Sequence, residues 1–268
     1  IQNKNLVQYF LAESKNIYLP ALILIFLLLV GGIGAFVVYE KVQFQAKSKQ
    51  DFFNFLTHEL KTPIATTRLS IETVLRRKLD EVQQQKLLLS ALSETNRLNI
   101  LTNNILLASQ MEEKNFQREH EEVNLADVVE TVVSDYKNRY PGRRIEASAD
   151  KDLYIEGDEL LIQIALSNLI DNALKYAPKE SPVYIDLMDD NEITQIKVSD
   201  EGMGVPDEEK QKIFEKFYRI GDESTRTTKG TGLGLYLCKK ISEFHQATIN
   251  VEANMPNGSV FKINFPIS

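Results

Sequence analysis

The first hydrophobic feature of the chain is an uninterrupted apolar run near its N-terminus. Leucine, isoleucine and valine dominate Ile17–Val38, and no charged residue stands between Asn16 and Tyr39. A helix of about 20 apolar residues spans the hydrocarbon core of a bilayer. A cleaved signal peptide would have a shorter run followed by a cleavage site. We therefore predict the end of an extracytoplasmic segment over residues 1–16 and a transmembrane helix over residues 17–39.

Beyond this run, apolar residues recur at helical spacing in two stretches separated by a short charged turn near residues 78–81. The apolar positions of the first stretch are Phe53, Leu56, Leu60, Ile64, Ile71 and Val74. Those of the second are Leu87, Ala91, Leu98, Leu101, Ile105 and Ala108. The pattern predicts an all-α helical hairpin over residues 40–112. One hairpin cannot bury both stripes, so we expect two copies to pair as a dimeric four-helix bundle. A simple coiled-coil stalk is the alternative.

A polar linker over residues 113–121 separates the hairpin from a region of short, mixed apolar patterns over residues 122–268. We predict helices over 125–140, 158–177 and 233–245, and strands near 122–124, 145–149, 153–156, 183–188, 193–199, 248–253 and 259–265. This order predicts an α+β sandwich, in which one mixed sheet lies under a layer of helices.

Charge and cysteine content narrow the function. The 268 residues carry a formal net charge of −7, which argues against a nucleic-acid-binding surface, so we expect no nucleic-acid partner. Cys238 is the only cysteine, so no intrachain disulfide can form. A single thiol fits a reducing cytoplasm for the bulk of the chain.

The first candidate for chemistry is His58, in the first helix of the predicted hairpin. His58 lies two residues from Leu56 and two from Leu60, which places it roughly opposite the apolar stripe and toward solvent. Glu59 adjoins it, and Thr62 follows one helical turn later. An isolated His-Glu pair of this kind is more often an ordinary surface histidine.

A second group of polar residues interrupts the apolar helix predicted over 158–177. Asn168, Asn172 and Lys175 are spaced four and three apart and share one face, and Tyr176 follows. Asparagine disfavours helix interiors, and its amide oxygen is a suitable ligand for Mg²⁺. A solvated polar helix face is the alternative.

Two glycine-rich segments follow. Asp200, Gly202 and Gly204 come directly after a predicted strand, where glycine lets the backbone approach a flat ligand and Asp200 can accept a hydrogen bond from an adenine amino group. Alone, this is also an ordinary strand-ending turn. The second segment opens a helix, where backbone amides suit phosphate, but it does not open a βαβ unit, so we exclude a dinucleotide-binding fold. Its residues are Gly230, Thr231, Gly232, Leu233 and Gly234.

Together these segments resemble bacterial sensor histidine kinases, with a HisKA-type dimerisation and phosphoacceptor domain followed by a GHKL-type ATP-binding catalytic domain of the Bergerat fold. The stretch around His58 resembles the phosphoacceptor box. The remaining boxes are matched in order: Asn168–Tyr176 resembles the N box, Asp200–Gly204 the G1 box, Phe214–Arg219 the F box and Gly230–Gly234 the G2 box.

The resemblance implies a site that binds ATP and Mg²⁺. By this resemblance Asn172 coordinates Mg²⁺, Asn168 supports the phosphates and Lys175 contacts a phosphate. Tyr176 stacks on adenine and Asp200 reads its amino group. Further nucleotide-binding candidates are the glycines of the G1 box, Phe217 and Arg219 of the F box, and the five residues of the G2 box. Residues 206–229 form a lid over ATP.

The resemblance also implies an activity. His58 accepts the γ-phosphoryl group of ATP and passes it to an aspartate of a response regulator, Glu59 orients the ring or accepts its proton, and Thr62 serves dephosphorylation of the regulator. We expect a homodimer in the lipid bilayer of the bacterial inner membrane, with its catalytic part in the cytoplasm.

Two other functions compete with the kinase. ATP-hydrolysing members of the superfold resemble one another in carrying a glutamate where this chain has Asn168, and an amide cannot act as a base. A non-enzymatic scaffold should have lost some of the boxes, and all five are present.

Overall fold

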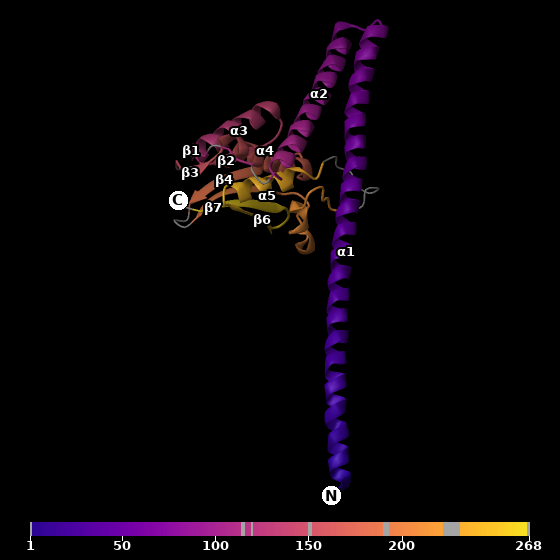
Figure 1. Cartoon of the computed structure of the whole chain (residues 1–268). Coiled ribbons are helices and arrows are strands. Elements are labelled where there is room, and N and C mark those ends of the chain that lie inside the picture. The colour runs from indigo at the N-terminus through magenta and orange to yellow at the C-terminus, as the bar shows by residue number, and fades with distance from the viewer. Residues whose placement is uncertain are drawn as a thin grey trace. The chain divides into compact units, whose positions relative to one another are not determined.

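Figure 1 shows the fold of the chain in a computed structural model. The structure describes residues 2–113, 116–118, 120–149, 152–189, 193–221 and 231–266. Within the first helix it describes the backbone alone at residues 2–19, 21, 44–45, 47–49, 51–52, 55 and 58. The chain divides into two units, Ile1–Phe55 and Leu56–Ser268.

The first unit consists of the N-terminal part of helix α1, which runs from Gln2 to Arg76. The stretch Leu22–Gln43 of this helix is long and apolar enough to cross a membrane by length and composition. All its side chains are exposed, including Phe26 and Leu28, whereas a core helix of a soluble protein would bury them. The stretch overlaps most of the predicted transmembrane helix.

The second unit begins with a helical hairpin, formed by the rest of α1 and by α2 (Glu81–Gln110). The turn lies where the sequence predicts it, and the Asp80 carboxylate accepts a hydrogen bond from the Gln83 N–H, 2.7 Å away, which caps α2. Large apolar side chains remain exposed on both helices, among them Ile64, Leu75 and Leu92. The single chain therefore leaves apolar stripes of the hairpin uncovered.

The remainder of the second unit is an α/β domain. Its helices are α3 (Leu125–Arg139), α4 (Glu159–Tyr176) and α5 (Gly234–Phe244), with two short 3₁₀ helices, η1 (Asp207–Glu209) and η2 (Lys212–Phe214). Its strands are β1 (Glu121–Asn124), β2 (Ile145–Ser148), β3 (Tyr154–Gly157), β4 (Val183–Asp189), β5 (Ile193–Asp200), β6 (Thr248–Ala253) and β7 (Ser259–Pro266). Each of these helices and strands, apart from the 3₁₀ helices, lies within one residue of its predicted bounds.

The strands form two sheets, where the sequence analysis predicted one. Five strands in the order β2-β4-β5-β7-β6 make a mixed sheet, in which β2 and β4 are parallel and the other pairs antiparallel. Strands β1 and β3 pair only with each other in the described part of the chain. The Leu125 N–H donates to the Leu153 carbonyl at 2.8 Å, which ties this small ribbon to the start of α3.

The core lies between the five-stranded sheet and its helices. Leu166, Leu169 and Ile170 of α4 are fully buried, as are Ile185 of β4 and Ile196 of β5. Burying a side chain of this kind contributes about 1.5–3 kcal/mol to stability. The apolar face of α4 is thus fixed against the sheet, and Asn168 and Asn172 remain half-buried on another face of the helix.

Candidate active site

A cavity of about 570 Å³ lies beside the polar face of α4, within the usual size range of small-molecule sites. It brings together residues from α4, the end of β5, the start of α5 and the segment after η2. The predicted nucleotide-binding residues in its lining are Asn168, Asn172, Lys175, Tyr176, Asp200, Gly204, Arg219, Thr231, Gly232 and Gly234. These ten predicted residues, which are spread over positions 168 to 234, thus meet at one cavity.

Helix α4 is fixed at its N-terminus by Asp158. The Asp158 carboxylate accepts a hydrogen bond from the Leu161 N–H at 2.9 Å, and the Asp158 N–H donates to Nε2 of the buried His245 at 2.9 Å. An N-cap of this kind stabilises a helix by about 1 kcal/mol. It sets the position of the helix that presents Asn168 and Asn172 to the cavity.

The start of α5 approaches α4 very closely. The Asn168 Nδ2 group donates to the Ile164 carbonyl at 2.9 Å, which fixes the direction of the amide oxygen. A Cβ atom at Gly234 would lie only 2.8 Å from that oxygen. Glycine is therefore needed where α5 begins, and it brings the amides of a helix N-terminus beside Asn168, an arrangement that suits phosphate.

The F-box segment is seated on the glycine loop that precedes α5. The Phe217 N–H donates to the Gly232 carbonyl at 3.0 Å, and a Cβ atom on Gly232, whose φ is +67°, would lie 2.6 Å from the Phe217 carbonyl carbon. The Tyr218 hydroxyl donates to Glu209, which ties the segment to η1. These contacts hold Arg219 at the cavity. The predicted lid is described only up to residue 221, and Gly230 lies outside the described residues.

Asp200 lies at the end of β5, where its residue is only 4% exposed. Its Oδ1 atom accepts a hydrogen bond from the Gly202 N–H at 2.7 Å. Burial raises the pKa of this carboxyl, and the backbone N–H groups of Gly202 and Ser259 oppose the shift. A Cβ atom on Gly202 would lie 2.7 Å from Oδ1 and 3.0 Å from the Tyr176 carbonyl, so this turn requires glycine.

Lys175 and Tyr176 lie next to each other at the C-terminal end of α4. The Lys175 ammonium is 4.7 Å from the centroid of the Tyr176 ring, within cation–π range. Tyr176 remains 41% exposed. The pair presents one aromatic surface and one positive charge to the same cavity, which are the groups that a purine and its phosphates would use.

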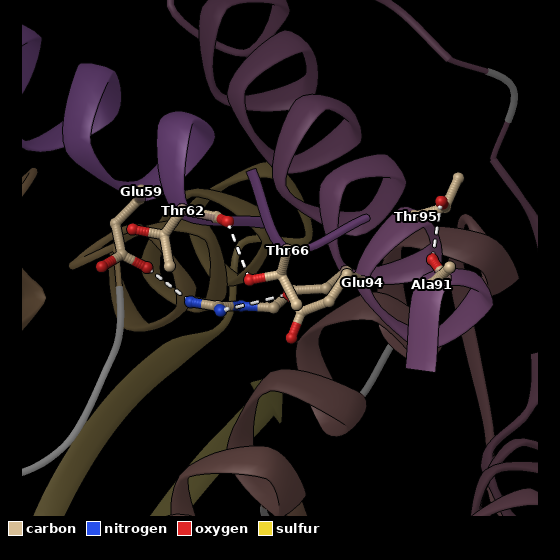
Figure 2. Close-up of polar contacts among 7 residues, drawn as sticks. Glu59, Thr62, Thr66, Ala91, Glu94 and Thr95 are labelled. Carbon is tan, nitrogen blue, oxygen red and sulfur yellow. Dashed lines mark hydrogen bonds and ion pairs between the residues drawn. The ribbon is translucent and has the colours of Figure 1, made fainter. Parts of the chain in front are cut away.

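A further polar group lies in the hairpin (Figure 2), and its residues Glu59 and Arg97 also line the cavity. The Glu59 side chain is 10% exposed, and its Oε2 atom lies 2.5 Å from the Arg97 guanidinium of α2. Arg97 also lies 3.7 Å from Glu94. The Thr66 hydroxyl donates to the Thr62 carbonyl at 3.1 Å. The His58 side chain lies outside the described residues, so its exposure stays a prediction.

Both the helical hairpin and the α/β domain match models of known protein families. Residues 48–114 match the family model of the His Kinase A (phospho-acceptor) domain. Residues 157–268 match that of the histidine kinase-, DNA gyrase B- and HSP90-like ATPases. The chain belongs to the histidine kinase family.

Sequence relatives include the sensor histidine kinase WalK of Bacillus subtilis, which is 29% identical over 225 residues, covering 82% of this chain and 37% of WalK. The chain spans 37–54% of the length of the first curated relatives that it matches. Among solved structures, the histidine kinase AdeS of Acinetobacter baumannii is 25% identical with a TM-score of 0.60, covering 79% of this chain and 98% of AdeS. The histidine kinase ThkA, solved in complex with the response regulator protein TrrA, is 25% identical with a TM-score of 0.59, and the match covers 80% of this chain and 60% of the matched chain.

Three of the predicted nucleotide-binding residues lie outside the described lining of the cavity, and other residues of that lining were not predicted. Gly202, Phe217 and Leu233 are absent from the described lining, and Leu233 is fully buried. The lining residues that were not predicted from the sequence include Ser259, at the start of β7 directly after a glycine, and Arg97 of α2. A glycine before a strand and an arginine within an apolar helical stripe were the available signals.

The donor set around Asn172 fits Mg²⁺. Within the described residues there is no cluster of three or more histidine, cysteine or acidic side chains that would form a complete metal site. Mg²⁺ at nucleotide sites takes only one or two protein oxygens and completes its shell with phosphate oxygens and water. The Asn172 amide, which lines the same cavity as the start of α5, is therefore a suitable donor.

Proposed function

We propose that this chain is the kinase portion of a membrane-bound sensor histidine kinase of a bacterial two-component system. It phosphorylates His58 from Mg²⁺-ATP, transfers the phosphoryl group to an aspartate of a response regulator, and removes phosphate from the regulator. The observation that supports it best is the cavity, which gathers residues of the N, G1, F and G2 boxes in a chain that also carries a phosphoacceptor domain.

The proposed organisation follows the predicted one. Residues 1–16 end an extracytoplasmic segment, 17–39 span the membrane, 40–112 form the dimerisation and phosphoacceptor domain, 113–121 the linker, and 122–268 the ATP-binding domain. The exposed apolar stretch of α1 supports membrane insertion. The uncovered apolar stripes of the hairpin support a homodimer, because a second copy would bury them in a four-helix bundle.

In the proposed nucleotide site each residue has one task. Asp200 accepts a hydrogen bond from the adenine 6-amino group, and Tyr176 stacks on the base. Lys175 and the amides at the start of α5 bind the phosphates, with Asn168 beside them. Asn172 would hold Mg²⁺, which neutralises phosphate charge during transfer.

In the proposed transfer a ring nitrogen of neutral His58 attacks the γ-phosphorus. The P–O bond to the β-phosphate breaks, ADP leaves, and the proton on the other ring nitrogen passes to Glu59. Neutral imidazole is abundant near pH 7 and nucleophilic without activation. The Arg97 ion pair fixes the direction of the Glu59 carboxylate, whose residue adjoins the histidine.

Hydrolysis of ATP is a weaker proposal for this site. A hydrolase needs a base to activate water, and Asn168, which stands at that position, offers only an amide whose NH₂ group already donates to the Ile164 carbonyl.

The proposed function is tested by following the γ-phosphoryl group. The chain in lipid nanodiscs is incubated with labelled ATP and Mg²⁺, and receiver domains of the source organism are then added. We expect label to enter the kinase first and then to move rapidly to one receiver. A variant of that receiver whose acceptor aspartate is replaced by asparagine should receive no label. Free phosphate released without any labelled protein would refute the kinase and favour a hydrolase. ThkA, a structural relative solved with a response regulator protein, motivates this partner.

A second experiment separates the two activities of the phosphoacceptor helix. Thr62→Ala should leave autophosphorylation intact and impair removal of phosphate from the regulator, because a hydroxyl one turn from His58 can orient an attacking water. Thr66→Ala, one turn further along α1, is the matched control. Equal loss of both activities in Thr62→Ala would show that Thr62 is only structural.

A further inference from the structure

The connection between β6 and β7, residues 254–258, closes on the turn that carries Asp200. The Asn254 Nδ2 group donates a hydrogen bond to the Asp200 carbonyl at 2.9 Å. The Asn254 N–H donates to the Gly258 carbonyl at 3.0 Å, which closes the connection on itself. Asn254 is not among the described residues that line the cavity, so its side chain acts on the end of β5 rather than on a ligand.

Two glycines make this contact unusually close. A Cβ atom on Gly258, whose φ is +121°, would lie 1.9 Å from the Asp200 carbonyl oxygen. Gly204, whose φ is +74°, would place a Cβ atom 3.1 Å from the Gly258 carbonyl oxygen. The connection and the Asp200 turn therefore touch backbone to backbone, and neither can shift without moving the other.

The first residue of β7, directly after this connection, reaches the Asp200 side chain. The backbone N–H of Ser259, the residue after Gly258, donates to the Asp200 carboxylate, and Gly202 donates to it at 2.7 Å from within the turn. Asp200 is thus fixed twice, through its carbonyl by Asn254 and through its carboxylate by Ser259. Fixing both groups sets the direction in which the carboxylate faces the cavity.

We propose that Asn254 is a positioning residue that sets the purine selectivity of the nucleotide site by fixing the Asp200 carboxylate. This inference rests on the proposed function, in which Asp200 reads adenine. Adenine presents an N–H donor at its 6-position, whereas guanine presents an acceptor oxygen there. A rigid carboxylate accepts from the first and repels the second, and a mobile carboxylate discriminates less well.

The test compares Asn254→Ala and Asn254→Asp with the wild type, using the whole chain in lipid nanodiscs. Asn254→Asp keeps the shape of the side chain but replaces the donor by an acceptor that faces the Asp200 carbonyl. Asn250→Ala, an exposed position of β6, is the control. The readouts are the dissociation constants of ATP and GTP with Mg²⁺, KM and kcat for autophosphorylation, and the unfolding temperature.

We expect both Asn254 variants to lower the preference for ATP over GTP by roughly three- to tenfold, the scale of one hydrogen bond, with Asn254→Asp at least as impaired as Asn254→Ala. KM for ATP should rise while kcat at saturating ATP stays unchanged, and Asn250→Ala should match the wild type. A retained ATP preference in either variant, even with a lower unfolding temperature, would overturn the inference and leave the kinase assignment intact. A wild type without any ATP preference would instead refute Asp200 as the adenine reader, and the inference with it.

Discussion

Replacing His58 by glutamine is expected to abolish phosphorylation of the protein while ATP affinity stays unchanged. Glutamine retains a polar side chain of similar length in the helix, but its amide nitrogen does not attack phosphorus. The predicted nucleotide-binding residues that line the cavity all lie after position 160, so loss of the acceptor should leave binding intact. This separation of binding from transfer is what distinguishes a phosphoacceptor from a residue that only shapes the nucleotide site.

The measurement is label incorporation from γ-labelled ATP, combined with a dissociation constant for ATP on the same preparation. The chain has three histidines, so His120→Gln provides the matched control at an exposed position, and it should label like the wild type. Labelled His58→Gln protein would place the acceptor elsewhere. Loss of ATP affinity in this variant would mean that His58 acts in the nucleotide site.

Replacing Asn172 by alanine is expected to weaken nucleotide binding by about 10- to 100-fold in Mg²⁺, the range typical of damage to a metal shell, and to have little effect in EDTA. The fold should survive, because Asn172 lies on the cavity side of α4 and alanine favours helix more than asparagine. Autophosphorylation should fall accordingly, since the phosphate charge would remain unneutralised.

Gln163→Ala on the same helix is the control for this experiment, because Gln163 is outside the described cavity lining and should bind nucleotide normally. The readout is the ATP dissociation constant of each variant in Mg²⁺ and in EDTA, with helix content followed in parallel. Unchanged affinity of Asn172→Ala in Mg²⁺ would show that the metal is held by other groups.

Much of the fold was predictable because its signals are local. The hairpin helices are long and periodic, and the turn between them is marked by a charged break capped by Asp80. The asparagines of α4 stand out because they interrupt an apolar helix, and that helix packs its leucines on the sheet as expected. Part of the lining of the cavity was predicted from the family resemblance of several boxes, which no single spacing would have supplied.

What sequence reasoning missed depends on contacts between distant positions. Glu59 and Arg97 are 38 residues apart, and Asn254 and Asp200 are 54 apart, so neither pairing has a local pattern. The separate β1–β3 ribbon was missed for the same reason, since strand partners follow from tertiary packing rather than from each strand's own residues. The orientation of the His58 ring stays a prediction.

The most direct test of the kinase assignment is the chemical identity of the phosphorylated group in the wild-type protein. The chain in nanodiscs is incubated with γ-labelled ATP and Mg²⁺. The stability of the protein-bound label to acid and to base is measured, and the labelled residue is mapped by peptide mass spectrometry. If His58 is the acceptor, we expect one labelled peptide, which contains His58. Its label should be lost in acid and kept in base, as a phosphoramidate requires. Acid-stable label, or label on any other residue, would contradict the assignment.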